Sequence, residues 1–284
     1  MDAGGPLHSA RDYFHRHLKR KKTDLAKRVK LAEDINNWFK KAWFQNDTAF
    51  SDLVEVENYL AHLAAVTVLF VESPGSIAEL GAFSASDVLR HKLLAVVNES
   101  HPDDSFIADG PIRRLKNHDA SRVRYDSWNS REPDSRDARR AFLRIAKDII
   151  SLVESLDAAR PKQSEFKKDN TGHTLLFVAD LIWLQGAVSR SEVVEVLDAV
   201  GGDASLDNVR RHLSILQSVA FIDKRKRGDE TFYVPLLAEP FLGYAYTNDA
   251  VRKGVVKIKQ AIRQSLDGRR KSIVVSMLKA ASNV

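Results

Sequence analysis

The stretch VTVLFVESPGSIAELGAF, residues 66–83, decides the fold of the N-terminal part of the chain. Val66 to Phe70 form an apolar run rich in β-branched residues without polar alternation, which is typical of a strand buried on both faces of a parallel sheet. We expect a turn over Glu72–Ser76, where proline fixes φ and glycine can take φ > 0. A helix from Ile77 to Leu89 then follows, with Ser76 as its N-cap. A strand, a small-residue loop and a helix N-terminus form a binding site for an anion at the carboxyl edge of a sheet.

The composition limits the class of protein. With 284 residues and 44% hydrophobic content, the chain can form two modest domains. The absence of cysteine excludes disulfides, thiolate metal sites and a cysteine nucleophile. No apolar run reaches the ~18 residues of a membrane helix, and the N-terminus has no secretory h-region. We therefore expect a cytoplasmic protein that has no membrane contact, no bound metal and no cofactor.

The charge of the chain is unevenly distributed. The net charge is +6, and residues 161–284 hold 19 Lys and Arg against 14 Asp and Glu. Residues 1–160 therefore hold 25 basic against 24 acidic residues. A basic C-terminal part is compatible with a nucleic-acid partner, although many basic proteins bind none.

Alternating elements in the first part predict an α/β unit with a mostly parallel, Rossmann-like sheet flanked by helices. Strands are expected at residues 27–32, 66–70, 92–97 and 123–125, and helices at residues 9–22, 35–44, 50–64, 77–89 and 135–156. Residues 103–114 are expected to be a loop with a turn at Asp109-Gly110-Pro111. A nucleotide-binding unit normally begins with a strand before its glycine turn, and only three residues precede Gly4-Gly5. The first strand is thus expected to be missing or cut short.

The second part has a different pattern. Residues 158–172 lack an apolar period and contain a proline and three lysines, so they are the expected linker between a domain at 1–157 and one at 173–284. Three helices at 173–184, 189–199 and 206–219 precede a hairpin whose tip is basic. This order is that of a winged helix, a variant of helix-turn-helix. From residue 248 the chain is expected to be helical to its end.

The segment Ser76-Ile77-Ala78-Glu79 has two interpretations. The simpler one is a capping box, in which Glu79 reaches back to the amide of Ser76. The other is catalytic, because a carboxylate kept ionised by a helix dipole can attack or stabilise an oxocarbenium-like anomeric carbon. Gly81 is expected to let this helix approach the sheet closely. Glu79 can cap in the resting state and react when substrate binds.

Glu72-Ser73-Pro74-Gly75-Ser76, followed by Glu79-Leu80-Gly81-Ala82-Phe83, resembles the active-site segment of nucleoside 2′-deoxyribosyltransferase-like proteins. It is most similar to the branch that serves as retron effectors, the toxic partners of a reverse transcriptase and its multicopy single-stranded DNA. Residues 105–107 and 110–113 resemble a downstream block, and Gly4-Gly5 and Glu33-Asp34 match two shorter ones. A winged helix after the glycosidase-like domain completes the resemblance.

The resemblance implies cleavage of an N-glycosidic bond, with Glu79 as nucleophile and Glu72 or Ser73 near the ribose or base. A dinucleotide such as NAD is then the expected substrate, cut between nicotinamide and ribose. Gly4 and Gly5 are then expected to line the nucleotide site, and Asp34 to orient a hydroxyl. Gly75 and Ser76 of the loop, and Arg113 as a phosphate-binding cation, are the remaining expected substrate contacts. Paired arginines on a loop are, however, more often solvated.

The basic residues of the second domain are expected to contact nucleic acid or a partner protein. Arg210 and Arg211 lie on the third helix, where a DNA reader carries its base contacts. The tip of the hairpin is formed by Lys224, Arg225, Lys226 and Arg227. Phosphate attraction scales with such charges whatever the sequence. A winged helix that binds protein, with these side chains merely solvated, is an equal alternative.

The leading hypothesis is therefore an antiphage retron effector toxin that hydrolyses the nicotinamide bond of NAD under the control of a reverse transcriptase and multicopy single-stranded DNA. Two alternatives remain. One is an enzyme that exchanges or hydrolyses bases on deoxynucleosides or nucleotides. The other is a DNA-binding regulator whose α/β domain senses a nucleotide without cleaving it. Higher-order assembly is compatible with each.

Overall fold

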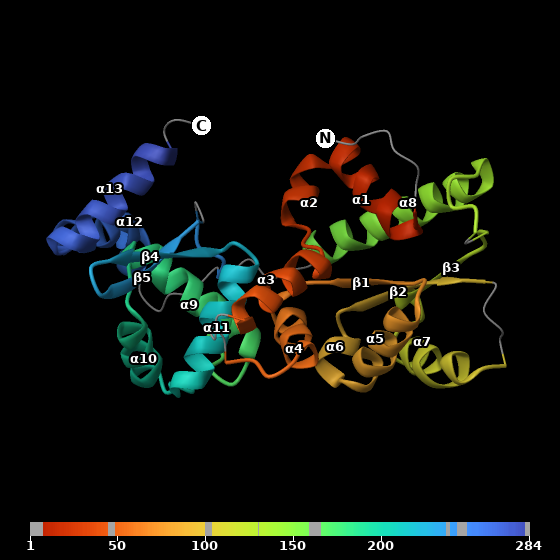
Figure 1. Cartoon of the computed structure of the whole chain (residues 1–284), viewed down its shortest axis with the longest axis horizontal. Helices are drawn as coiled ribbons and strands as arrows, with labels where there is room; N and C mark the ends of the chain where they lie inside the picture. Colours follow the sequence, from red (N-terminus) through yellow and green to blue (C-terminus); the bar gives the residue numbers. More distant parts are fainter. Residues whose placement is uncertain are drawn as a thin grey trace. The chain divides into compact units, whose positions relative to one another are not determined.

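The computed structural model of the chain separates into two units (Figure 1). It describes residues 8–44, 49–99, 104–129, 131–158, 166–236, 239–242 and 249–281. The first unit combines residues 1–29 with 64–160, and the second combines 30–63 with 161–284. The expected boundary assigned 30–63 to the first domain, whereas their contacts place them in the second. Of the expected linker, residues 159–165 lie outside the described residues, and 171–172 already belong to a helix.

The first unit contains a parallel three-stranded sheet. Its strands are β1 (Thr67–Val71), β2 (Leu93–Asn98) and β3 (Val123–Asp126), in the order β1-β2-β3. Every residue of β2 is buried, as expected for the central strand of a sheet covered on both faces. These three strands and their parallel pairing confirm the prediction of an α/β unit.

Helices cover both faces of this sheet (Figure 1). One face carries α1 (Ala10–Lys21), α2 (Thr23–Arg28) and α8 (Arg136–Ala158), and the other carries α5 (Pro74–Ala85), α6 (Asp87–Arg90), the π-helical η1 (Ala108–Ile112) and α7 (Arg113–His118). A 3-10 turn, η2 (Ala120–Arg122), leads into β3. Phe70, Leu94 and Val96 point to the α1 and α8 face, where they join Phe14 and Phe142 in one core. Because side chains alternate along a strand, their neighbours in β1 and β2 point to the opposite face.

Two local predictions in the first part are wrong. Residues 27–32 do not form a strand, because α2 continues to Arg28 and α3 (Ala32–Phe44) begins four residues later. Only the short connection between them is extended, as at Val29. The expected loop at 103–114 contains η1 and α7. Pro111 lies inside η1, where the wider π-helical turn accommodates a residue that has no N–H to donate.

The second unit consists of helices and a hairpin. Its elements are α3, α4 (Leu53–Leu63), α9 (Thr171–Gln185), α10 (Arg190–Ala199), α11 (Leu206–Ser218), β4 (Ile222–Arg227), β5 (Glu230–Pro235), α12 (Asp249–Ser265) and α13 (Gly268–Ala281). The predicted order of three helices, a hairpin and a helical tail is confirmed. Val188, between α9 and α10, also forms an antiparallel bridge to Tyr233 of β5.

Close packing explains why α3 and α4 belong to the second unit. Phe39 of α3 and Val56 of α4 are fully buried in one core with Leu213 of α11. At the start of α9, a Cβ on Gly172 would lie 2.4 Å from the backbone oxygen of His62, so only glycine fits this approach. The N-terminal helices thus complete the core of the C-terminal unit.

None of the described helices is both long enough and apolar enough to cross a membrane.

Candidate functional site

The loop between β1 and α5 begins the helix earlier than the sequence predicts. Ser73 is the N-cap and Pro74 the first helical residue, a position that proline favours because its fixed φ suits the helix. The side chain of Ser73 accepts a hydrogen bond from the Ser76 amide at 3.2 Å, and Ser76 Oγ accepts one from the Ser73 amide at 2.9 Å. The capping box is therefore formed by Ser73 and Ser76, and the predicted box of Ser76 and Glu79 is wrong.

Ser76 and Gly75 shape this first turn. Ser76 Oγ also accepts a hydrogen bond from the Glu72 amide at 3.0 Å and donates to the Ser73 carbonyl oxygen at 2.8 Å. Gly75 lies inside α5 without a positive φ, contrary to the expected turn. A Cβ on Gly81 would have no neighbour within 4 Å, so the expected close approach of this glycine to the sheet is also wrong.

Glu72 connects the loop to the start of α1. Although part of its side chain is exposed, Oε1 accepts a hydrogen bond from the Ala10 amide at 2.8 Å and Oε2 one from the Arg11 amide at 3.4 Å. Burial raises the pKa of the Glu72 carboxyl, while these two amide hydrogen bonds oppose the rise. The carboxylate thus satisfies two amides that a helix N-terminus otherwise leaves free.

Glu79 lies in the second turn of α5 and is half-buried. Its carboxylate accepts no hydrogen bond from any of the described residues. Burial raises the pKa of Glu79, and the nearby Arg11 guanidinium opposes the rise. Burial is thus the largest influence on the Glu79 pKa, and its direction is opposite to the one expected from the helix dipole. The result is a poorly solvated carboxylate with one cation nearby.

Arg11 is a member of this site that the sequence did not identify. Its backbone amide donates a hydrogen bond to Glu72, and its guanidinium acts electrostatically on both Glu72 and Glu79. A signal was nevertheless present, because a cation in the first turn of a helix opposes the helix dipole. Such a local conflict is typical of a functional position.

The other predicted substrate contacts are distributed differently. Arg113 forms an exposed ion pair with Asp109 at 2.7 Å, one turn away. Asp34 lies in the first turn of α3, in the second unit, and so is not among the residues that the first unit brings together. Gly4 and Gly5 lie outside the described residues.

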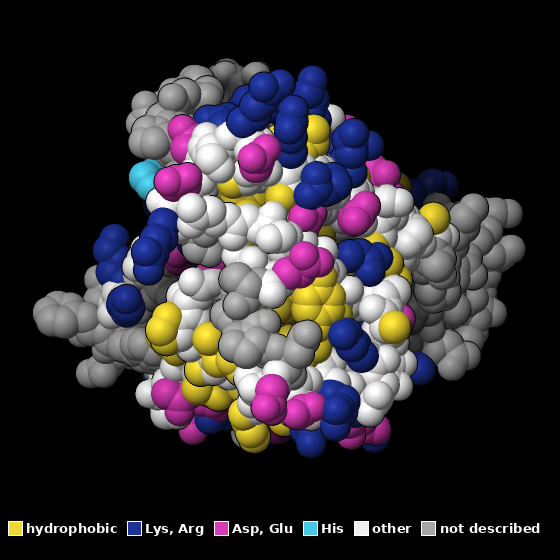
Figure 2. All heavy atoms as spheres, turned by 90° about the vertical axis from the view of Figure 1, so that its right-hand side faces the viewer, with side chains coloured by type: hydrophobic (Ala, Val, Ile, Leu, Met, Phe, Trp, Pro, Cys, Tyr) yellow, Lys and Arg dark blue, Asp and Glu magenta, His cyan; other side chains and the backbone are white. Residues whose placement is uncertain are grey.

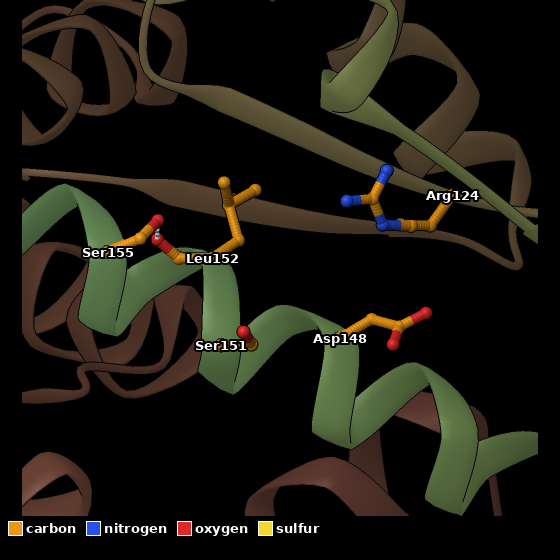
Figure 3. Close-up of a pocket in the computed structure, with 5 residues that line it drawn as sticks. All are labelled: Arg124, Asp148, Ser151, Leu152 and Ser155. Carbon is orange, nitrogen blue, oxygen red and sulfur yellow. Dashed lines mark hydrogen bonds between the residues drawn. The ribbon is translucent and has the colours of Figure 1, made fainter.

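A shallow hollow of about 240 Å³ lies between β3 and α8 (Figure 3). The Arg124 guanidinium reaches from β3 toward α8, whose Asp148, Ser151, Leu152 and Ser155 complete the lining. No residue of the β1–α5 loop lines it. Within the described ranges, no group of three or more His, Asp or Glu side chains could hold a metal ion.

Helix α11, the expected DNA reader, is largely enclosed. Its buried residues lie on several sides of the helix: Asn208, Val209, His212, Leu213, Ser214, Ile215 and Leu216. Arg211 forms an ion pair with Glu55 of α4 at 2.9 Å, and Arg210 lies 3.5 Å from Asp207. Both cations already have acidic partners within the second unit.

His212 of α11 is 2% exposed. Burial lowers its pKa to about 4, with a smaller lowering contribution from Arg211, while Asp203 and the Asn208 backbone oppose the shift. The ring is therefore neutral at pH 7 and belongs to the core beside Tyr59.

The hairpin tip is more accessible. Arg225, Lys226 and Arg227 are exposed and Lys224 is half-buried. Arg225 pairs with Asp223 at 2.7 Å, whereas Lys226 and Arg227 form no ion pair within the described part of the chain. The tip, not α11, is thus the accessible part of the predicted nucleic-acid surface.

The fold and loop define a two-unit α/β protein with two carboxylates beside the end of a parallel strand. The chain belongs to the STM3845 retron effector protein family, which it matches over residues 7–224. This match covers parts of both units and ends within β4, so that β5, α12 and α13 lie beyond it. The predicted resemblance to retron effectors is thereby confirmed.

Two relatives from Escherichia coli support this assignment. The chain is 30% identical over 230 residues to "Retron Ec86 putative ribosyltransferase/DNA-binding protein", covering 78% of this chain and 70% of that protein. It is 26% identical over 197 residues to "Retron Ec73 putative ribosyltransferase/DNA-binding protein", covering 65% of this chain and 61% of that protein. The match to the second relative thus spans less than two thirds of its length.

Proposed function

We propose that this retron effector is an N-glycosidase that hydrolyses the bond between nicotinamide and ribose in NAD, with Glu79 as the nucleophile. The observation that carries the proposal is the state of Glu79: a half-buried carboxylate that no described residue hydrogen-bonds, on the helix that follows a parallel strand. The word ribosyltransferase in the names of both relatives supports transfer at a ribose carbon.

The reaction proceeds in two balanced steps. In the first, a Glu79 carboxylate oxygen forms a bond to C1′ as the C1′–N bond breaks, and its electron pair moves to the pyridinium nitrogen, so that nicotinamide leaves as a neutral molecule. In the second, water attacks C1′, the bond between C1′ and the Glu79 oxygen breaks and regenerates the carboxylate, and the proton of the water is released to solvent. Partial burial favours this role, because a poorly solvated carboxylate is a better nucleophile than a fully hydrated one.

The residues around Glu79 hold the substrate and keep the Glu79 carboxylate in position. Glu72 fixes the start of α1 and thereby the position of Arg11, which offers a cation to a substrate phosphate. Ser73, Gly75 and Ser76 form the first turn of α5, whose cap keeps Glu79 in position. Gly4, Gly5, Asp34 and Arg113 remain proposed substrate contacts that depend on the resemblance alone.

The second unit is proposed to be a winged helix that contacts nucleic acid or a partner protein. Three helices, the β4–β5 hairpin and the bridge from Val188 to Tyr233 support this assignment. The reverse transcriptase and its multicopy single-stranded DNA are the proposed partners, and they hold the toxin inactive in the cytoplasm until a phage infects. Lys226 and Arg227 are the cations best placed for such contacts.

The test is release of nicotinamide from NAD by purified protein, measured with and without the two partners. Glu79→Gln should lower the rate by at least about a hundredfold, as expected for loss of a nucleophile. Glu195→Gln, an exposed change on α10, is the matched control and should retain the wild-type rate. Intact release by Glu79→Gln would contradict the assignment.

The names of the relatives contain both ribosyltransferase and DNA-binding protein, so base exchange on nucleosides and DNA binding without catalysis are the two alternatives to test. Incubation with deoxynucleosides distinguishes the first, since free base would then appear without NAD cleavage. Ligand protection against thermal unfolding without turnover, together with sequence-specific duplex binding, would indicate a regulator.

A further inference from the structure

Helices α1 and α8 lie side by side on one face of the first unit's sheet (Figure 1). They run in the same direction. The ring of Tyr13 lies 5.8 Å from that of Phe142, and further along the chain Lys22, which directly follows α1, pairs with Glu154 of α8 at 2.7 Å. Their inner faces are apolar, with Phe14, Leu18 and Ile149 buried. The outer surface between the two helices, here called the α1–α8 seam, is available for a ligand.

A groove of about 510 Å³ lies at the start of this seam. It is lined by Tyr13 of α1 and by residues of α8 and the turn before it: Asp134, Arg136, Arg139, Arg140 and Leu143. Arg139 is bonded to Asp134, and Arg140 lies 3.4 Å from Asp137. Arg136 forms no ion pair within the described part of the chain. The groove thus combines an aromatic ring and a leucine with three guanidinium groups and one carboxylate, and two of the guanidinium groups are paired with aspartates.

Further cations continue the seam beyond this groove. Burial is the largest cause of the lowered pKa of His17, and the next causes are Lys21, Arg20 and Lys147. One ring is therefore close to cations from both helices, two from α1 and one from α8. Among the described residues, none of these three cations has an ion-pair partner. His17 itself stacks on Tyr13 with ring centroids 6.0 Å apart, which connects the two ends of the seam.

Figure 2 shows that Lys and Arg side chains gather toward the top of this end of the first unit, at the height where Figure 1 draws α1 and α8. Acidic side chains are scattered over the whole of the same face. The net charge of +1 for residues 1–160 therefore conceals a local basic surface.

We propose that the α1–α8 seam binds the phosphate backbone of a single-stranded nucleic acid, with a base stacked on Tyr13. Planar guanidinium groups bind phosphate oxygens bidentately, which a row of lysines alone cannot do. Cations that follow the backbone, combined with an aromatic ring, are typical of single-strand recognition. From Arg136 to Lys147 the helix extends about 16 Å, enough for several phosphates. The proposal does not depend on glycosidase activity, because its test measures binding alone.

The experiment compares charge-reversal variants of the full chain. Binding of a fluorescent single-stranded oligodeoxythymidine is measured by anisotropy at several salt concentrations. Arg136→Glu combined with Lys147→Glu should raise Kd at least about tenfold and reduce the salt slope of log K by about 1.4, since each lost cation contributes roughly 0.7. Lys40→Glu with Lys41→Glu, exposed on α3, makes the same change in net charge and should alter Kd less than about twofold.

Tyr13 provides a second readout. Tyr13→Leu should weaken binding about fivefold or more because stacking is lost, whereas Tyr13→Phe should bind like the wild type. Circular dichroism and Tm, measured for every variant, identify any that fail to fold. Equal losses in the seam and α3 variants, or competition by polyglutamate as effective as that by the oligonucleotide, would overturn the proposal, the second result indicating an acidic protein partner instead.

Discussion

Helix α5 of the first unit and helix α11 of the second both carry charged side chains that the sequence predicts to be functional, but these side chains differ in what they contact. Glu79 of α5 is half-buried and accepts no hydrogen bond within the described part of the chain. Arg211 of α11 pairs with Glu55, and His212 is almost fully enclosed. A desolvated group that lacks a partner is available to a ligand, whereas a paired one contributes to the fold.

The same contrast exists within the β1–α5 segment. Glu72 bonds two amides of α1, while Glu79, seven residues later, has only the electrostatic influence of Arg11. We therefore propose that Glu72 belongs to the architecture of the site and Glu79 to its chemistry. The following predictions test both comparisons, in order of decreasing effect on the free energy of unfolding.

The largest effect is expected from His212. Its folded pKa of about 4 lies below the unfolded value near 6.5, so the unfolded state binds more protons between these pH values. The stability of the second unit should therefore fall as pH falls from 6.5 to 4, by at most about 1.4 kcal/mol per pH unit. Urea unfolding at pH 7, 5.5 and 4.5 measures this slope.

The control for this prediction is His212→Gln, which should lose this part of the pH slope. An NMR titration of the wild-type ring gives an independent readout that does not require the variant to fold. A ring that titrates near 6.5 would show that α11 is more open than described.

Glu72→Ala should destabilise the first unit by about 1–2 kcal/mol, because two amides at the start of α1 lose their acceptor. Glu72→Gln keeps one acceptor oxygen and should therefore lower the free energy of unfolding by less. Urea unfolding gives the free energies, and faster hydrogen exchange at Ala10 and Arg11 locates the change. If Glu72→Ala were as stable as the exposed control Glu195→Ala, the architectural role of Glu72 would be wrong.

The ion pair between Arg211 and Glu55 should show a coupling energy of about 1 kcal/mol in a double-mutant cycle, since both side chains are about 30% exposed. The exposed pair of Lys27 and Asp24 on α2 is the matched control and should show nearly none. Arg211→Ala should leave the affinity for single-stranded DNA unchanged within about twofold. A large loss of DNA affinity would show that α11 is part of the nucleic-acid surface.

The smallest effect is expected on the stability of Glu79→Gln. Because burial raises the folded pKa of this carboxyl, its ionised form is disfavoured in the folded protein. The neutral amide should therefore raise Tm at pH 7, by up to about 2 °C. The gain should disappear below about pH 4.3, where the carboxyl is protonated in both states. A lower Tm at pH 7 would indicate a stabilising partner of Glu79 that the structure does not describe.

Much of the fold could be predicted because its pattern is local. The apolar runs that became β1 and β2 are too short and too rich in β-branched residues for helices, and the stripe of Phe142, Ile145 and Ile149 predicts α8. A strand was wrongly predicted over residues 27–32 because the alternating Val29 and Leu31 are also typical of a strand. An alternating pattern does not show whether a neighbouring strand is present with which this segment could pair.

The assignment of α3 and α4 to the second unit could not be predicted in this way. An amphipathic helix shows which face it buries but not against which partner, so the apolar faces around Phe39 and Val56 fitted either unit. The ion pair of Arg211 follows from that packing, since its partner Glu55 lies on α4. The start of α5 was misjudged because Pro74 was interpreted as a turn residue when it is also a favoured first residue of a helix.

The most direct test of the account is the rate of nicotinamide release from NAD by Glu79→Gln and Glu72→Gln, prepared and measured side by side. We predict no release above background for Glu79→Gln and at least about a tenth of the wild-type rate for Glu72→Gln. The reason is that the Glu79 carboxylate reacts with the substrate, whereas the Glu72 carboxylate only holds the start of α1 in position. A folded Glu72→Gln variant without activity beside an active Glu79→Gln variant would reverse the two roles and contradict the account.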